Sequence, residues 1–94
     1  MARAMGGEAI YMPTPGEPGI IAWGPAPSRA AVVEELMHLG QHRALGWADV
    51  SGKIVDLELA AQNRLLTTGA RLGWTDAELA RIAAARARWA AGGR

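Results

Sequence analysis

The distribution of proline divides this chain into two parts of different character. All five Pro residues lie between positions 13 and 27, among several Gly residues, and none follows. Because Pro fixes φ and lacks a backbone N–H, it is excluded from helix interiors, whereas a long Pro-free stretch can be helical throughout. We therefore expect an extended segment at residues 1–27 and a helical core at residues 28–93.

Two short apolar runs in the Pro-rich part have the composition of β-strands. They are Glu8–Met12 and Gly19–Trp23, and Pro13–Pro18 separates them. β-Branched and aromatic residues on both sides of a turn that contains Pro and Gly predict a hairpin. A connection this rich in Pro can also hold the two runs apart. The expectation for this part is therefore a short β-hairpin or an extended segment.

Sequence signals for helix ends divide the second part into three helices. Ser28 has the side chain of an N-cap. Leu45-Gly46-Trp47 and Leu72-Gly73-Trp74 both place Gly where a helix ends in a Schellman motif. Thr75 and Glu78 have the spacing of a capping box. The expected fold class is α+β, with a hairpin followed by helices over about residues 29–45, 52–72 and 76–91.

Length and composition exclude several classes of protein. A chain of 94 residues is expected to form a single small domain, 1–94. The net charge of +1 gives no electrostatic footprint for nucleic acid. The absence of Cys excludes disulfides and thiolate zinc sites. No apolar run is long enough for a membrane span.

The first predicted helix has an apolar side and a polar side on a helical wheel. Taken alone, this pattern predicts that the apolar side faces the core and that the polar side is solvated. The apolar side consists of Val32, Val33, Leu36, Met37, Leu39, Gly40 and Ala44, and the polar side of Glu34, Glu35, His38, Gln41 and His42.

The second predicted helix places two polar residues where a core is expected. Glu58 and Gln62, spaced i, i+4, lie between two apolar stripes, and other polar residues lie on the opposite side. A buried carboxylate without a partner is costly or becomes protonated, so Glu58 needs a cation, a donor or a metal. The two stripes are Ile54, Leu57, Ala61, Leu65 and Leu72, and Val55, Leu59 and Leu66.

The first helix offers several partners for Glu58. They are His38, His42 or an ion held between the two helices. Glu34 and His38 are spaced i, i+4, so both can reach one ion, and Glu35 can point at the same space. Two simpler alternatives stay open at this point: Glu58 forms a buried structural pair with a basic residue of the first helix, or it lies at the rim of the stripe and reaches water.

The spacing of these residues resembles a known metalloprotease motif. Glu34-Glu35-Leu36-Met37-His38, followed by Glu58, resembles the zincin pattern His-Glu-x-x-His with a downstream glutamate ligand. Over residues 8–91 the chain is similar to the zincin-like metallopeptidase toxin domains of bacterial polymorphic toxin systems. The residues that carry this similarity are Ala9–Pro13, Ile20–Trp23, Val33–Arg43 and Glu58–Leu66.

The resemblance implies a metal-dependent hydrolase of the peptidase type. Glu35 matches the catalytic glutamate, His38 the second ligand His and Glu58 the downstream ligand, whereas Glu34 stands where the first His is expected. The implied metal ligands are therefore Glu34, His38 and Glu58. Zinc is the expected ion, and this carboxylate-rich set also suits manganese or iron. Residues expected to orient the ligands or contact the substrate are Gln41, His42 and Gln62.

The resemblance also implies a biological setting. Such a domain is the C-terminal part of a larger bacterial protein and is secreted or delivered into a target cell with it. It acts on a protein or peptide and is neutralised by an immunity protein. A free-standing chain would be cytoplasmic.

Three other functions fit parts of the same pattern. Glu35-x-x-His38 occurs in di-iron carboxylate bundles, where a symmetric dimer would have to complete the site. A metal-free nuclease-type toxin would use Glu35, His38 and His42 as acid and base. A non-catalytic helical interaction domain would keep a structural contact between Glu58 and His38 and dock a partner through Trp89.

Overall fold

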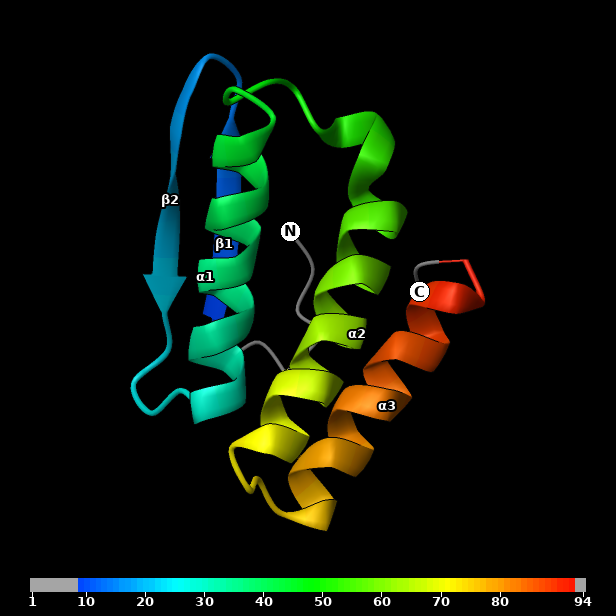
Figure 1. Ribbon diagram of the computed structural model, residues 1–94. Helices are drawn as coiled ribbons and strands as arrows, with labels where there is room; N and C mark the ends of the chain where they lie inside the picture. The colour runs from blue at the N-terminus through cyan, green and yellow to red at the C-terminus, as the bar shows by residue number, and fades with distance from the viewer. Residues whose placement is uncertain (1–8, 93–94) are drawn as a thin grey trace.

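A two-stranded antiparallel hairpin followed by three α-helices makes up the part of the chain that the computed structural model describes, residues 9–92 (Figure 1). This confirms the α+β class and the predicted order of elements. Glu8 and Gly93, which the predicted strand and helical core include, lie outside the described residues. The elements are β1 (Ala9–Thr14), β2 (Glu17–Trp23), α1 (Arg29–Ala44), a 3-10 turn (Ser51–Lys53), α2 (Ile54–Arg71) and α3 (Asp76–Ala90).

The hairpin turns more tightly than the sequence predicts. Pro13 and Pro18 belong to β1 and β2, so the turn itself consists of Pro15 and Gly16. Gly16 has a φ of +84°, and Pro followed by a residue with positive φ is the arrangement of a type II turn. The Pro-rich connection therefore does not hold the strands apart, and they pair along their length with one irregularity near the turn.

Both Leu-Gly-Trp sequences end a helix, as predicted. Gly46 and Gly73 have left-handed φ angles of +68° and +75°, which Gly adopts without steric cost. In each case the N–H of the following Trp donates to the carbonyl five residues earlier at 2.9 Å. These hydrogen bonds define the Schellman motif, and they allow the chain to reverse sharply after α1 and after α2.

Helix α2 lies between α1 and α3, and the hairpin packs against α1 (Figure 1). Gly69 lets the Trp74 ring lie directly on α2, because a Cβ at this position would come within 2.5 Å of that ring. The apolar core is built mainly from small residues and a few large ones: Ala9, Ala30, Ala31, Leu65, Trp74 and Ile82.

The predicted apolar stripes are only partly correct. Leu65 and Ala61 are buried on α2, but Leu72 is 61% exposed and Val55 is 38% exposed. Leu72 lies just beyond the last residue of α2 and so leaves the helical face on which the stripe depends. The larger departure concerns α1, whose polar side is buried.

Candidate metal centre

Buried polar side chains gather between α1, α2 and β1. The prediction that Glu58 and Gln62 are buried is confirmed, since both are fully inaccessible to solvent. The prediction that the polar side of α1 is solvated is wrong, because α2 and the hairpin cover that side. The buried polar residues are Glu34, Glu35, His38 and His42 on α1 and Glu58 and Gln62 on α2.

His38 lies at the centre of this group. Its Nε2 atom is 2.6 Å from Oε1 of Glu58 and 3.5 Å from Oε2 of Glu34. The Gln62 side-chain amide donates to Oε2 of Glu34 at 2.9 Å, which connects α2 back to α1. The structure therefore brings together the three residues expected to hold a metal, from two helices that are separated by a loop.

Gln41 sets the orientation of the His38 ring. Its Oε1 atom lies 2.9 Å from His38 Nδ1, and its Nε2 atom donates to the carbonyl of Leu57 at 2.9 Å. Because an amide oxygen can only accept, Nδ1 of His38 carries the proton of this hydrogen bond. The other ring nitrogen, Nε2, therefore points at the carboxylates, which is the orientation that a ligating His needs. This placement agrees with the orienting role expected for Gln41.

Glu35 occupies a different part of the same cluster. Its Oε1 atom accepts a hydrogen bond from the backbone N–H of Tyr11 in β1 at 2.6 Å. Burial, reinforced by the nearby charge of Glu34, raises the pKa of the Glu35 carboxyl to about 7, even though His38 and the Tyr11 N–H act in the opposite direction. A carboxyl with a pKa near neutrality can exchange a proton at physiological pH.

Glu34 and His38 also have perturbed pKa values. Burial raises the pKa of Glu34, and this effect exceeds the stabilisation of its carboxylate by His38 and Gln62. Burial lowers the pKa of the His38 imidazolium, but the neighbouring Glu34 and Glu58 carboxylates oppose burial and raise that pKa to about 10. His38 is therefore the cation that the cluster holds in the absence of a metal.

Within residues 9–92, five buried polar atoms of the cluster make no hydrogen bond. Two of them, His38 Nε2 and Glu58 Oε1, lie 2.6 Å apart and form a buried ion pair, whereas the other three have no partner of either kind. Buried polar atoms are normally paired, and a bound ion or water is one explanation for atoms that are not. The five atoms are Glu34 Oε1, His38 Nε2, Glu58 Oε1, Glu58 Oε2 and Gln62 Oε1.

The donor set fits a divalent cation. Glu34, Glu35 and His38 each offer one ligand atom, and these atoms lie within 4.8 Å of one another. Carboxylate oxygens and an imidazole nitrogen are ligands for zinc and for harder ions such as manganese. This buried group could therefore bind a metal, with Glu58 beside it across the interface.

His42 is buried on the same side of α1 as His38, but its hydrogen-bond partners lie outside the group around His38, although the sequence analysis places it near the ion or the substrate. Its Nε2 atom is 3.1 Å from the carbonyl of Ala48, and its Nδ1 atom is 2.6 Å from the Tyr11 hydroxyl. Since the carbonyl accepts, Nε2 is the protonated nitrogen, and the Tyr11 hydroxyl donates to Nδ1. The hydroxyl in turn accepts from the N–H of Gly19 at 2.9 Å.

Tyr11 is the residue that sequence reasoning missed. It is fully buried, its hydroxyl holds His42 and its backbone N–H holds Glu35. The signal in the sequence is that this Tyr lies in a predicted strand, where its ring is expected to be buried and its hydroxyl to need a hydrogen-bond partner. Gly19 makes the arrangement possible, because a Cβ there would lie 2.6 Å from the Tyr11 ring.

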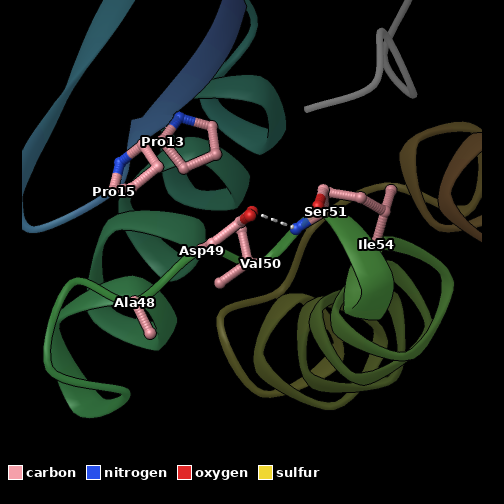
Figure 2. A pocket seen from close by; sticks show the side chains of 7 residues that line it. All are labelled: Pro13, Pro15, Ala48, Asp49, Val50, Ser51 and Ile54. Atoms are coloured by element: carbon pink, nitrogen blue, oxygen red, sulfur yellow. Dashed lines mark hydrogen bonds between the residues drawn. The ribbon is translucent and has the colours of Figure 1, made fainter.

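A pocket of about 210 Å³ lies at the end of the molecule where the hairpin turn meets the loop before α2 (Figure 2). In this loop the Asp49 carboxylate accepts from the N–H of Ser51 at 3.0 Å. No residue of the buried cluster lines the pocket. Its lining residues are Pro13, Pro15, Ala48, Asp49, Val50, Ser51 and Ile54.

Comparison with known protein families, with curated proteins and with solved structures finds no match to this chain. Within residues 9–92, no helix has the length and apolar character needed to cross a membrane.

Proposed function

We propose that this protein is a metal-dependent hydrolase of the peptidase type. The observation that carries the proposal is the buried group of carboxylates around His38, in which Glu34 Oε1, Glu58 Oε2 and Gln62 Oε1 have no partner within residues 9–92. A folded protein pays a large desolvation penalty for such atoms unless a ligand satisfies them. A divalent cation satisfies carboxylates and an imidazole nitrogen together, whereas a hydrogen-bonded water satisfies fewer charges.

In this proposal Glu34, His38 and Glu58 hold the ion, and Gln41 fixes the His38 ring. Zinc is the ion we propose, and manganese or iron are the alternatives that a carboxylate-rich set favours. When bound, such an ion polarises a substrate carbonyl and lowers the pKa of a water molecule. Glu35, with a pKa of about 7, accepts a proton from the attacking water and returns it to the leaving nitrogen.

The resemblance of Glu34-Glu35-Leu36-Met37-His38 and Glu58 to zincin-like toxin domains supports the same activity. On that basis we propose that the domain acts on a protein or peptide after delivery as part of a larger bacterial protein. An immunity protein would then be its natural inhibitor.

The test separates metal binding from hydrolysis. Protein loaded with zinc or manganese is incubated with a mixture of synthetic peptides, and cleavage is followed by mass spectrometry. We expect Glu35→Gln to retain the metal and lose cleavage, and Glu58→Gln to lose both. Glu17→Gln in the hairpin, on an exposed Glu far from the cluster in sequence, is the matched control. Metal-loaded wild-type protein that cleaves no faster than Glu35→Gln contradicts the proposal.

The inaccessibility of the cluster to solvent favours a second candidate function. Glu34, His38 and Glu58 are fully inaccessible, and Glu35 is 2% exposed, whereas a catalytic metal site keeps a position open to substrate. A non-catalytic interaction domain, with Glu58 and His38 as a structural contact, needs no opening. A bound ion that a small chelator removes rapidly favours the hydrolase, and a protein that binds no ion and cleaves no peptide favours the interaction domain.

A further inference from the structure

A groove of about 720 Å³ lies between α1 and α2, and all of its described lining residues come from these two helices. Its volume is in the range of ligand-binding pockets, and most of its lining is apolar, as such pockets require. Val33 and Met37 form part of the apolar lining, and Gln41 and Arg64 are polar residues on opposite helices. A few polar groups in an apolar groove can fix the orientation of a ligand.

The floor of the groove lies next to the buried cluster. Ala61 lines the groove although it is only 1% exposed, so it lies at the bottom, and the residue that follows it, Gln62, belongs to the cluster. Gln41 also lines the groove, and its Oε1 atom accepts from the His38 ring. A ligand in the groove would therefore contact the side chain that orients His38.

Gln41 keeps a hydrogen-bond donor for such a ligand. A side-chain amide carries two N–H groups, and the acceptor that the Gln41 amide has within residues 9–92 is the carbonyl of Leu57. The second N–H can donate to a carbonyl oxygen, which every residue of a peptide carries. A peptide backbone therefore suits this part of the groove.

Gly40 leaves one wall of the groove without a side chain. It lies inside α1, where Gly is less favourable than Ala. A Cβ at this position would meet no atom within 4 Å, and Gly40 does not have a positive φ. Neither the packing nor the backbone of residues 9–92 therefore requires Gly here. Its absent side chain does allow the backbone of a ligand to approach α1 closely.

Arg64 supplies the charge of the groove, since the other lining residues are uncharged. Its side chain is exposed, and it forms no ion pair with another residue between positions 9 and 92. A guanidinium group binds a carboxylate through two parallel hydrogen bonds. Charge complementarity therefore favours a ligand with an acidic side chain over a neutral or basic one.

We propose that this groove binds a peptide segment that has apolar side chains and one acidic side chain. Gln41 donates to a backbone carbonyl of the peptide, and Arg64 binds its carboxylate. The identification of this peptide as the substrate rests on the proposed hydrolase function. Cleavage would also require the floor of the groove to open, whereas binding would not, so binding and cleavage are measured separately.

Fluorescence polarisation measures binding, with and without zinc, to matched mixtures of short labelled peptides. The peptides are built from Leu, Val and Ala and differ in one fixed residue, which is Glu, Gln or Lys. We expect a Kd about tenfold lower for the Glu mixture than for the Lys mixture. Arg64→Glu should reverse this preference. Arg43→Glu, at an exposed Arg of α1 that does not line the groove, is the matched control and should keep it.

A second pair of variants tests the location of the peptide. Gly40→Leu fills the groove and is expected to abolish binding. Gly52→Leu, at a Gly outside the groove whose Cβ would also meet no atom within 4 Å, should leave binding unchanged. Circular dichroism verifies that each variant is folded.

The outcomes distinguish this proposal from the proposed function. Wild-type protein that binds no mixture, or binds the Glu and Lys mixtures equally, overturns the proposal, as does binding that survives Gly40→Leu. Peptides that bind as expected and are never cleaved support the groove and contradict the hydrolase. Cleavage that continues unchanged in Gly40→Leu overturns the groove and leaves the hydrolase standing.

Discussion

Helix α2 packs against its two neighbours in different ways. Towards α3 it presents Leu65, which belongs to an apolar core with Ile82 and Trp74. Towards α1 it presents Glu58 and Gln62, which are fully buried. Figure 1 shows both neighbours beside the same helix. The comparison teaches that the α2–α3 contact is mainly apolar, whereas the α1–α2 contact also encloses a cluster of charged and polar side chains.

Burying charged side chains between α1 and α2 is unusual for a chain with so few large apolar residues. Of the 47 apolar residues, 20 are Ala and none is Phe, so the core has few large side chains to spare. Three carboxylates, those of Glu34, Glu35 and Glu58, nevertheless lie around the single imidazole of His38. Turning the polar side of α1 inward also leaves Leu36 half-exposed. The proposed ion site would account for both features.

Truncation in the apolar contact is expected to have the largest effect. Ile82 is fully buried in the core, so Ile82→Ala leaves a cavity and is expected to lower the free energy of unfolding by about 2–5 kcal/mol. Urea denaturation with and without metal gives the measurement. Ala83→Gly, at an exposed neighbour on the same helix, is the control for helix propensity alone and should cost about 1 kcal/mol. Equal losses in the two variants would contradict the assignment of the core.

The polar contact is expected to make stability depend on pH. The folded-state pKa of Glu35 is about 7 against an ordinary value of 4.5, and that of His38 is about 10 against 6.5. Both groups bind protons more tightly when folded, so their contributions are complete below the ordinary pKa and disappear as the pH rises through the folded-state pKa. Metal-free protein should therefore lose stability from about pH 4.5 to about pH 10.

Two variants distinguish the contribution of the charges between α1 and α2 from that of the apolar core when stability is measured against pH. Glu35→Gln should flatten the decrease between pH 4.5 and 7, the window set by its two pKa values. Ile82→Ala should lower the whole curve without changing its shape, because no ionisable group is removed. A metal-free wild-type protein whose stability rises over this range would mean that the cluster does not hold extra protons.

Removal of one carboxylate is expected to have the opposite sign from truncation of the core. Metal-free Glu58→Gln at pH 8 should be more stable than wild type by about 1 kcal/mol, because two carboxylates remain to balance His38 and one buried charge is gone. Thermal and urea unfolding give the measurement. A loss above about 2 kcal/mol would show instead that Glu58 and His38 form an essential structural pair.

The smallest expected effect is local to the start of α3. Thr75 accepts from the N–H of Glu78, whose side chain accepts from the N–H of Thr75, and this confirms the predicted capping box. Thr75→Ala should lower the free energy of unfolding by about 1 kcal/mol. Thr67→Ala, at an exposed Thr within α2, should leave it unchanged or slightly higher. No loss in Thr75→Ala would indicate that α3 is held by packing alone.

Local signals in the sequence predict the elements well. The capping box, the Ser28 cap and the two Leu-Gly-Trp endings depend on neighbouring residues only, and the structure contains all of them. The burial of Glu58 could also be predicted, because apolar residues flank it on its own helix. These features needed no information from distant parts of the chain.

The orientation of α1 could not be predicted from its own residues. Its apolar side and its polar side each form a continuous stripe along the helix. Which of the two faces inward depends on β1 and on Glu58 and Gln62 of α2, which are distant in sequence. The link from the Tyr11 N–H to Glu35 is likewise a tertiary contact between strand and helix. Exposed Leu36 and buried Glu34 reverse the usual rule, and such reversals are expected at functional sites.

The most direct test of a cation site is a calorimetric titration of metal-free protein with zinc and with manganese, in buffers of different ionisation enthalpy. The account predicts one ion per chain for wild type, with release of the proton that His38 holds at neutral pH, and no binding to Glu58→Gln. No binding to wild-type protein, or equal binding to both proteins, would contradict it.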